Sequence, residues 1–344
     1  MAELSRRDVL KVLGGGAVAT ALSPLVNLTR VLSASLYEDQ LPPPTPLGRV
    51  AEISAELRES PTRKSRLVRS LRRDVMLQLD SQVVGQAVHP SNDVWFKTEG
   101  GYVYSSVVQP VQDIQNTPEP EKATDKFWGE VTVPFTDSRS APNPDLRRAI
   151  RFYYTTVYRV VQAKQDAKAQ WWYRLTDGWS RGGGLWVLAA HIRRIAPEDI
   201  TPLSSSVTDK RVEVNLKTQT MVAYENGLQV HTTKVCSGSG GFGTPRGTHK
   251  VLFKTPTLRM IGGAGSNYYD LPGVPFCTFI TWSGVAIHGA YWHNDWGRPR
   301  SHGCLNVPAD VARFYWRWTI PEAPYEQAVY YTPRKIGGTV VVVK

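Results

Sequence analysis

The sequence predicts a mainly β protein made of several small domains. Short runs in which apolar and polar residues alternate recur along the chain, and 28 glycines and 24 prolines separate them. A chain of 344 residues is long enough for two or three domains that each bury a core. With 41% hydrophobic and 21% charged residues, the composition is that of an ordinary globular protein.

The N-terminus predicts an export signal over residues 1–35. Arg6 and Arg7 resemble a twin-arginine motif, and the apolar stretch Val12–Val26 is too short for a lasting membrane span. Ser33–Ser35 offers a small-residue cleavage site. We expect export by the twin-arginine route to the periplasm or cell wall, with no stable membrane span after signal removal. A short cytosolic amphipathic helix is the competing interpretation, and the uncharged stretch argues against it.

A proline-rich spacer is expected over residues 36–47, because consecutive prolines in Leu41–Pro46 favour extended polyproline II structure. Residues 48–112 change to short alternating runs, which predict a small β-barrel with a hairpin turn at Gly100 and Gly101. The strands expected in this barrel are Arg49–Ser54, Val75–Leu79, Asp93–Lys97 and Tyr102–Tyr104.

The aromatic pattern of this barrel is repeated further on. Trp95–Lys97 and the paired glycines are echoed by Trp172–Arg174, a turn at Gly182–Gly184 and Trp186. We therefore expect a second small β-barrel over residues 128–200, after a linker at 113–127 that contains Pro118 and Pro120. Both barrels resemble bacterial Src-homology-3-like domains, and this resemblance implies that they target the protein to the cell wall.

Residues 207–344 predict a third β-rich domain. Arg211–Val235 alternates in the manner of strands, and Thr339–Val343 predicts a final strand. Ala309–Trp318 follows Pro308 and predicts a helix, which would support the turn that precedes it.

The candidate nucleophile of the chain lies in Ser301–Asn306, which reads Ser-His-Gly-Cys-Leu-Asn. A cysteine attacks carbonyls as its thiolate, and a neighbouring imidazole is expected to lower the pKa of the Cys304 thiol from about 8.5. Gly303 leaves room for a carbonyl beside Cys304. The backbone amides of these two residues are expected to stabilise the oxyanion of a tetrahedral intermediate.

Together with Ile287–Gly289, this run resembles the catalytic signature of L,D-transpeptidases, which cross-link peptidoglycan stem peptides through a cysteine acyl-enzyme. The resemblance covers residues 207–344 and includes a Thr-Pro-x-Gly turn at Thr244–Gly247. It implies an L,D-transpeptidase catalytic domain in which Cys304 is the nucleophile and His288 the general base.

The same resemblance implies further roles around the nucleophile. The carbonyl of Gly289 would orient His288, and Ser301, His302 and Asn306 would shape the pocket and the oxyanion region. The gap between His288 and Ser301 is 12 residues, shorter than is usual in the family, so His293 is the alternative base. Substrate-binding side chains are expected at Arg298, Arg300 and Tyr269, since arginine pairs well with a carboxylate, although arginines on a basic surface are common. No metal or organic cofactor is required.

These residues allow two other interpretations. His288, His293, His302 and Cys304 include zinc-binding side chains, but the chain has no His-x-x-x-His helix and no Cys-x-x-Cys pair, so no metal site is expected. A buried, unreactive Cys304 is disfavoured by its His-Gly and Asn neighbours. Cys236 and Cys277 either pair in a disulfide or are buried thiols, and the sequence leaves this open.

The net charge of +11 is concentrated in the C-terminal region. From Val207 onward, 15 lysines and arginines stand against 8 acidic residues, a difference of +7, whereas Leu36–Ser206 has 22 against 20, a difference of +2. Such a charge attracts an anionic polymer such as a bacterial wall. Because no nucleic-acid-binding motif accompanies it, nucleic acid is not expected as a partner.

The sequence therefore predicts an exported L,D-transpeptidase that acts on peptidoglycan stem peptides. An L,D-carboxypeptidase uses the same residues with water as the acceptor and is the nearest alternative. A wall-binding protein without catalytic activity is the alternative from another class. The oligomeric state, the diamino acid of the stem and the acceptor are left open.

Overall fold

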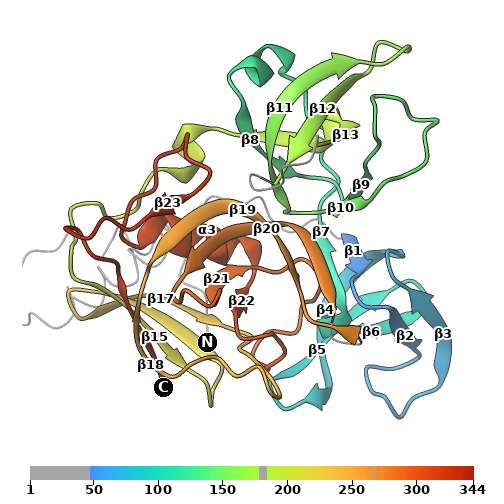
Figure 1. Ribbon diagram of the computed structural model, residues 1–344. Coiled ribbons are helices and arrows are strands. Elements are labelled where there is room, and N and C mark those ends of the chain that lie inside the picture. The colour runs from blue at the N-terminus through green and yellow to red at the C-terminus, as the bar shows by residue number, and fades with distance from the viewer. Residues whose placement is uncertain (1–46, 178–183, 266–267) are drawn as a thin grey trace, which may run out of the picture. The chain divides into compact units, whose positions relative to one another are not determined.

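The computed structural model describes residues 47–177, 184–265 and 268–344. The predicted export signal, the spacer up to Pro46, and Gly182 and Gly183 of the predicted turn lie outside these ranges. Strands dominate the described residues (Figure 1), so the prediction of a mainly β protein is confirmed. Among these residues, no helix has the length and apolar character needed to cross a membrane.

The first upstream sheet comprises strands β1–β7. Its order is β3-β2-β6-β5-β4-β1-β7, and its strand pairs are antiparallel. Gly100 and Gly101 have positive φ angles in the β5–β6 hairpin, as the sequence predicts. The strands are β1 (Leu47–Val50), β2 (Ser54–Arg58), β3 (Leu67–Arg72), β4 (Met76–His89), β5 (Asn92–Thr98), β6 (Gly101–Tyr104) and β7 (Val108–Val111), with the 3-10 turn η1 at Ser105–Val107.

One strand prediction in this sheet is wrong, because Arg49–Ser54 is not a single strand. β1 pairs with β4 and β7, whereas β2 pairs with β3 and β6, so the chain must bend between them. Ile53 lies in this bend and is 76% exposed. Strand β3 was not expected, since it is basic and exposed along most of its length and lacks the apolar alternation of a half-buried strand.

The second upstream sheet follows a segment that contains the 3-10 turn η2 (Pro120–Thr124). Its order is β13-β12-β11-β8-β14, and a separate hairpin pairs β9 with β10. The strands are β8 (Phe127–Val131), β9 (Phe135–Asp137), β10 (Arg151–Tyr153), β11 (Val157–Gln165), β12 (Trp171–Thr176), β13 (Leu185–Leu188) and β14 (Ile192–Ile195), and the 3-10 turns are η3 (Ala189–His191) and η4 (Pro197–Ile200).

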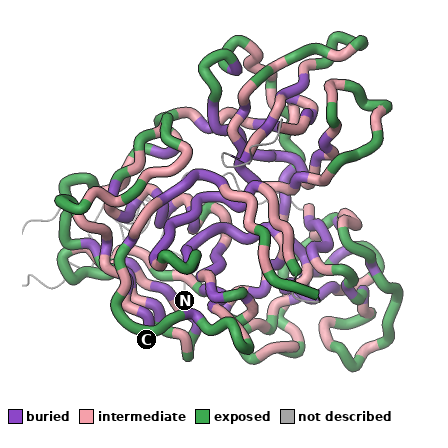
Figure 2. Tube along the Cα trace, in the orientation of Figure 1, coloured by how far each residue is buried: buried purple, intermediate pink, exposed green. Residues whose placement is uncertain are grey.

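The repeated tryptophans are core residues of the two upstream sheets. Trp95 on β5 is 1% exposed and Trp172 on β12 is 3% exposed. Their indole N–H groups donate to the Gln86 carbonyl and to Asp166. The repeated aromatic pattern therefore serves packing, and Figure 2 shows buried segments in both sheets. The likeness to Src-homology-3-like domains stays a prediction.

The C-terminal domain contains two five-stranded sheets. One has the order β17-β16-β15-β24-β18, and the other has the order β22-β21-β20-β19-β23. Most neighbours are antiparallel, but β15 with β24 and β21 with β22 are parallel. The strands are β15 (Lys210–Asn215), β16 (Thr220–Glu225), β17 (Leu228–Lys234), β18 (Gly247–Lys250), β19 (Phe253–Gly262), β20 (Tyr269–Phe279), β21 (Ala286–Gly289), β22 (Leu305–Val307), β23 (Tyr330–Tyr331) and β24 (Val340–Val343).

Helix α3 spans Ala309–Trp318, as the sequence predicts. Pro308 stands immediately before its first turn, where the missing N–H costs nothing. One face of the helix is buried and carries Ala312, Tyr315 and Trp316 at helical spacing. The helix contacts β20 and β21. The helix thus directly follows β22 and packs behind the strand that carries His288.

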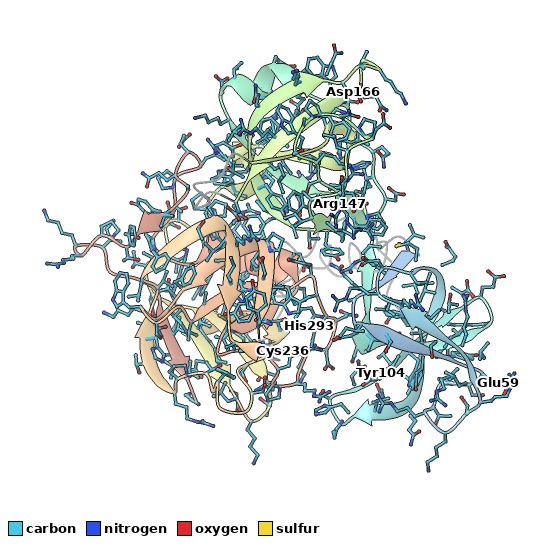
Figure 3. All side chains as sticks on the ribbon, turned by 45° about the vertical axis from the view of Figure 1, so that its right-hand side comes forward. Glu59, Tyr104, Arg147, Asp166, Cys236 and His293 are labelled. Carbon is cyan, nitrogen blue, oxygen red and sulfur yellow. The ribbon has the colours of Figure 1, made fainter. Side chains whose placement is uncertain are left out.

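All three cysteines are free thiols. Cys236 and Cys277 are buried thiols and do not form a disulfide, so the second of the two alternatives left open by the sequence holds. The Cys236 thiol donates to the Asp295 carbonyl at 2.8 Å. Figure 3 labels Cys236 and His293 in the C-terminal domain.

Candidate active site

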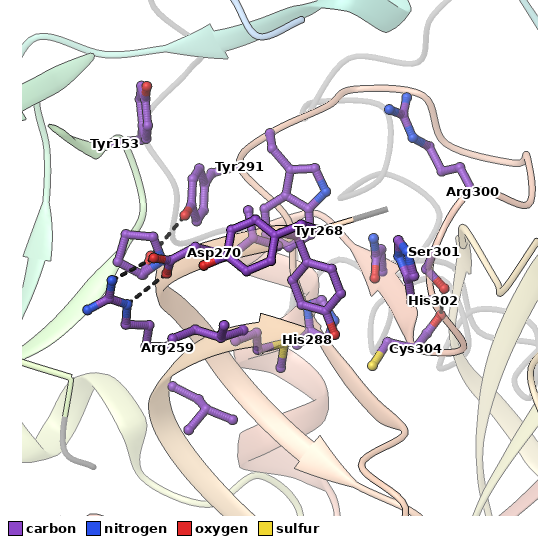
Figure 4. A pocket seen from close by; sticks show the side chains of 18 of the residues that line it. Tyr153, Arg259, Tyr268, Asp270, His288, Tyr291, Arg300, Ser301, His302 and Cys304 are labelled. Atoms are coloured by element: carbon purple, nitrogen blue, oxygen red, sulfur yellow. Dashed lines mark hydrogen bonds and ion pairs between the residues drawn. The ribbon is translucent and has the colours of Figure 1, made fainter. Parts of the chain in front are cut away.

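A cavity of about 870 Å³ contains Cys304 and His288 in its wall. Figure 4 shows the two residues together with Ser301, His302 and Tyr268 around this space. Most of the lining comes from strands β19, β20 and β21, from the turn that carries Cys304 (Ser301–Cys304, the cysteine turn), and from the segments next to these elements. The remainder comes from both upstream regions, namely Arg49, Ala51, Glu52, Arg73, Ile150, Arg151 and Tyr153. The sequence did not predict these upstream contributions.

The turn that carries Cys304 is held by a small set of hydrogen bonds. The Ser301 hydroxyl donates to the Cys304 carbonyl at 2.6 Å and accepts from the Gly303 N–H at 3.1 Å. The buried Thr244 hydroxyl donates to the Gly303 carbonyl at 2.8 Å. Gly303 has φ +111°, a conformation that side-chain-bearing residues rarely adopt. The Thr-Pro turn therefore braces the cysteine turn, a role that the sequence did not reveal.

These contacts correct the expected oxyanion site. The Gly303 N–H donates to the Ser301 hydroxyl, because the tight turn brings that oxygen over it. It is therefore engaged inside the turn and does not point at an incoming carbonyl. Of the two backbone donors that the sequence suggests, the amide of Cys304 remains.

The Cys304 thiol is free and half-buried in this site. Burial raises its pKa to about 11, and a backbone hydrogen bond from Ala286 opposes the shift. Its sulfur lies 3.6 Å from the Gly284 carbonyl oxygen, which accepts from the thiol. The expectation of a lowered thiol pKa is therefore wrong for the free site, because loss of water outweighs stabilisation of the thiolate.

His288 is buried on β21 with one tautomer favoured. Its Nδ1 lies 3.0 Å from the Gly289 carbonyl oxygen, and a carbonyl only accepts, so Nδ1 carries the proton and Nε2 is left as an acceptor. Burial lowers the pKa of His288 to about 4, so the imidazole is neutral near pH 7. A Cβ at Gly289 would lie 2.6 Å from Pro275 and 3.0 Å from Ala309, so glycine allows the close approach of α3.

His293, the alternative base, is buried away from the cavity lining. Its Nδ1 accepts from the Asp295 N–H at 3.3 Å, and its Nε2 lies 3.3 Å from the side-chain nitrogen of Asn306. Burial lowers its pKa well below 6.5. Asn306 does line the cavity, and its backbone pairs with Cys236 across the two sheets.

Of the other predicted site residues, Tyr269, His302 and Arg300 line the cavity and Arg298 does not. Tyr269 and His302 line the cavity with their ring centroids 4.9 Å apart. Arg300 also lines it, but its guanidinium donates to Glu52 at 2.7 Å and to Asp295 at 3.3 Å. Arg298 is exposed outside the lining and pairs with Asp295 at 3.4 Å. Both arginines thus already have protein carboxylates as partners.

Within the described ranges, no group of three or more His, Cys, Asp or Glu side chains has an arrangement suited to a metal ion. The cavity brings together a half-buried thiol and a neutral imidazole.

Part of the chain matches a known family. Residues 209–343 match the family model described as YkuD, the L,D-transpeptidase catalytic domain. These residues are an L,D-transpeptidase catalytic domain of the YkuD family.

Solved L,D-transpeptidase structures are similar to parts of the chain. The catalytic domain of the Enterococcus faecium enzyme, solved by NMR, is 27% identical over 40% of this chain and 98% of that chain, with a TM-score of 0.31. An L,D-transpeptidase from Mycobacterium smegmatis is 16% identical over 78% of this chain and 99% of that chain, with a TM-score of 0.33. The chain spans about half the length of a mutant Enterococcus faecium enzyme solved by crystallography, at 26% identity, 40% coverage of this chain and a TM-score of 0.31. No curated protein matches the sequence.

Proposed function

We propose that the chain is an exported L,D-transpeptidase that forms peptidoglycan cross-links through an acyl-enzyme on Cys304. The observation that carries the proposal is the shared cavity of Cys304 and His288, in which Nε2 of His288 is left to accept a proton. The family match of the catalytic domain supports the substrate class.

The proposed reaction has two steps. The Cys304 sulfur attacks the carbonyl carbon of the diamino acid in a stem peptide, while the thiol proton moves to Nε2 of His288. The tetrahedral intermediate then loses the terminal D-amino acid, whose amine takes that proton, and a thioester remains. The side-chain amine of a neighbouring stem attacks the thioester, and its proton returns to the sulfur by way of His288. The backbone N–H of Cys304 is the proposed donor to the oxyanion.

The protonation states favour proton transfer during the attack over a preformed thiolate. Burial holds the pKa of His288 at about 4 and that of Cys304 at about 11, so both groups are neutral near pH 7. The base acts only when it is neutral, so acylation should lose rate as the pH falls through about 4 and be flat from pH 5 to 8. Acylation rates measured across this range test the assignment. A rate that titrates near pH 6.5 would instead point to an exposed imidazole.

Mass spectrometry tests the nucleophile. Purified protein incubated with a carbapenem should gain one drug mass on a peptide that contains Cys304, and Cys304→Ala should gain none. Because the chain has two other free thiols, Cys236→Ser is the matched control and should be acylated like the wild type. An adduct that persists in Cys304→Ala contradicts the proposal.

Substitution of the two histidines separates the candidate bases. His288→Gln should slow acylation by about 10²–10⁴, the usual cost of losing a general base. His293→Gln should affect stability more than the chemical rate, because His293 is buried outside the cavity lining. The reverse result would transfer the role to His293.

The acceptor is tested by product analysis. With two defined stem peptides, the proposal predicts a cross-linked dimer and release of a D-amino acid. Release without a dimer would identify water as the acceptor and the enzyme as an L,D-carboxypeptidase.

Export by the twin-arginine route is part of the proposal, supported by Arg6, Arg7 and the weakly apolar stretch after them. Replacing both arginines with lysine should retain the precursor in the cytoplasm. Cell fractionation measures this, and unchanged export would favour the general secretory route.

A further inference from the structure

The cavity has a strongly basic lining. Two carboxylates line it, Glu52 and Asp270, against five arginines: Arg49, Arg73, Arg151, Arg259 and Arg300. Such an excess of positive charge in a concave site favours an anionic ligand.

Four of these arginines are already paired inside the protein. Arg49 and Arg151 both donate to Asp74, at 2.9 and 3.0 Å. Arg259 pairs with Asp270 at 2.6 Å, and Arg300 pairs with Glu52 at 2.7 Å. Within residues 47–177, 184–265 and 268–344, Arg73 forms no ion pair with a carboxylate. It is therefore the cavity arginine whose charge remains available for a ligand.

Arg73 is held by a fixed turn between β3 and β4. Its own N–H donates to the Ile53 carbonyl at 3.1 Å, and the next N–H, that of Asp74, donates to the Val50 carbonyl at 2.9 Å. Asp74 has φ +69°, and its carboxylate receives the two guanidinium groups described above. The backbone of Arg73 is thus anchored on both sides, which limits the entropy lost when its side chain binds a ligand.

The charge of Arg73 also acts on the cavity wall. Burial raises the pKa of Tyr153, and the charge of Arg73 is among those that oppose this shift. Tyr153 lines the same cavity and stacks on Tyr291 of the catalytic domain, with 5.5 Å between ring centroids. Because the charge of Arg73 acts on Tyr153 in the cavity wall, it also acts on a substrate bound in the cavity.

We propose that Arg73 binds a carboxylate of the peptide substrate that is separate from the carbonyl attacked by Cys304. This inference rests on the proposed function. The first upstream sheet then supplies a specificity residue to the catalytic cavity. A guanidinium suits this role because it stays charged and binds a carboxylate through two N–H groups. A stem of four extended residues spans roughly 14 Å, so one peptide reaches beyond the thiol to a second contact.

The test compares two peptides that differ in one group. A tetrapeptide stem with a free carboxylate outside the cleaved bond is paired with its carboxamide analogue, and the full chain is used throughout. The wild type should bind the carboxylate peptide about tenfold more tightly, the effect of one charge-assisted hydrogen bond. Arg73→Gln should remove this preference by raising KM for the carboxylate peptide alone, with kcat changed less than twofold. Arg73→Lys should keep part of the preference.

A matched control comes from the same edge of the sheet. Arg69 on β3 is exposed and lies outside the cavity lining, so Arg69→Gln should behave like the wild type. If Arg73→Gln weakens both peptides equally, or if the wild type has no preference, the inference is overturned.

Calorimetry with Cys304→Ala measures the same preference as a ratio of Kd values, without turnover. Absence of products and of a Cys304 adduct in the wild type would count against the proposed function. The ratio of Kd values, and its loss in Cys304→Ala carrying Arg73→Gln, decides the role of Arg73 separately.

Discussion

The second upstream sheet shares an apolar core with the catalytic domain, whereas the first upstream sheet meets that domain through hydrogen bonds and ion pairs. Trp128, Val157 and Ile195 of the second sheet belong to the same buried cluster as Val212 and Trp318 of the catalytic domain. All five are completely buried or nearly so. Contact of this kind stabilises in proportion to the apolar area removed from water, with little dependence on salt.

Several polar groups in the second-sheet contact form hydrogen bonds across it. The Trp128 indole N–H donates to the Tyr325 carbonyl at 2.7 Å, and the Tyr325 hydroxyl donates to the Ile195 carbonyl at 2.8 Å. The Glu130 carboxylate accepts hydrogen bonds from Arg193 at 2.8 Å and from Arg313 of the catalytic domain at 2.7 Å. The contact thus resembles the interior of a single domain.

The first sheet has a separate apolar core, drawn from residues 50–108. Its links to the catalytic domain are polar: Arg49 donates to the Tyr291 carbonyl at 2.7 Å, Ser106 to Asp295 at 2.9 Å, and Arg300 to Glu52 at 2.7 Å. Tyr291, Asp295 and Arg300 belong to the segment between His288 and the cysteine turn. The second sheet thus contributes mainly to stability, whereas the first fixes the segment beside the active site.

The largest expected effect comes from Trp128→Ala. Removing this side chain leaves a large cavity in the shared core, which should cost about 3–5 kcal/mol in free energy of unfolding. Denaturant unfolding followed by circular dichroism measures it, and the loss should be the same at low and high salt. Trp282, which is 73% exposed, provides the control, and Trp282→Ala should change stability by less than about 0.5 kcal/mol. A small effect of Trp128→Ala would mean that the sheet and the catalytic domain fold independently.

A smaller loss is expected from Arg49→Met, which removes the central polar link of the first sheet. Arg49 is 1% exposed and binds Asp74, Gln109 and the Tyr291 carbonyl. Because Asp74 keeps Arg151 as a partner, we expect about 2–3 kcal/mol, below the cost of breaking an isolated buried pair. The exposed Arg66–Glu59 pair gives the control, since Arg66→Met should be nearly neutral. Equal unfolding free energies for the two variants would remove Arg49 from its structural role.

Much of the catalytic domain was predictable because its elements are locally encoded. Helix Ala309–Trp318 has a proline before its first turn and an apolar face at helical spacing. Strand β24 is a run of valines, a residue type that favours strands. β3 escaped prediction because its pairing with β2, rather than its own pattern, makes it a strand. The bend after Val50 is likewise set by which strands pair across the sheet.

The site was predictable only as far as the motif extends. Of the residues that the motif predicts, Cys304, His288, Ser301, His302 and Asn306 line one cavity, whereas Gly289 and Gly303 do not. The pKa of the thiol depends on burial by elements distant in sequence, so the motif gave the wrong direction. Arg49, Arg73 and Arg151 carry no local signal of function, because only the tertiary contacts of the upstream regions bring them to the cavity.

The smallest expected effect is that of Glu52→Gln, which breaks the ion pair between the first sheet and Arg300. The two side chains are 30% and 27% exposed, so the pair should contribute at most about 1 kcal/mol. Salt screens such charges, since the Debye length falls from about 10 Å at 0.1 M to about 3 Å at 1 M. Thermal unfolding of the wild type and Glu52→Gln should therefore differ at low salt and converge at high salt.

Glu56→Gln, which loses a pair with Arg58 inside the first sheet, is the control that separates the Glu52–Arg300 contact from a general charge effect. Because Arg300 lines the cavity, Glu52→Gln should also alter carbapenem acylation of Cys304, whereas Glu56→Gln should leave it unchanged. A salt-independent loss as large as that of Trp128→Ala would contradict the description of this contact as a half-exposed ion pair that salt screens.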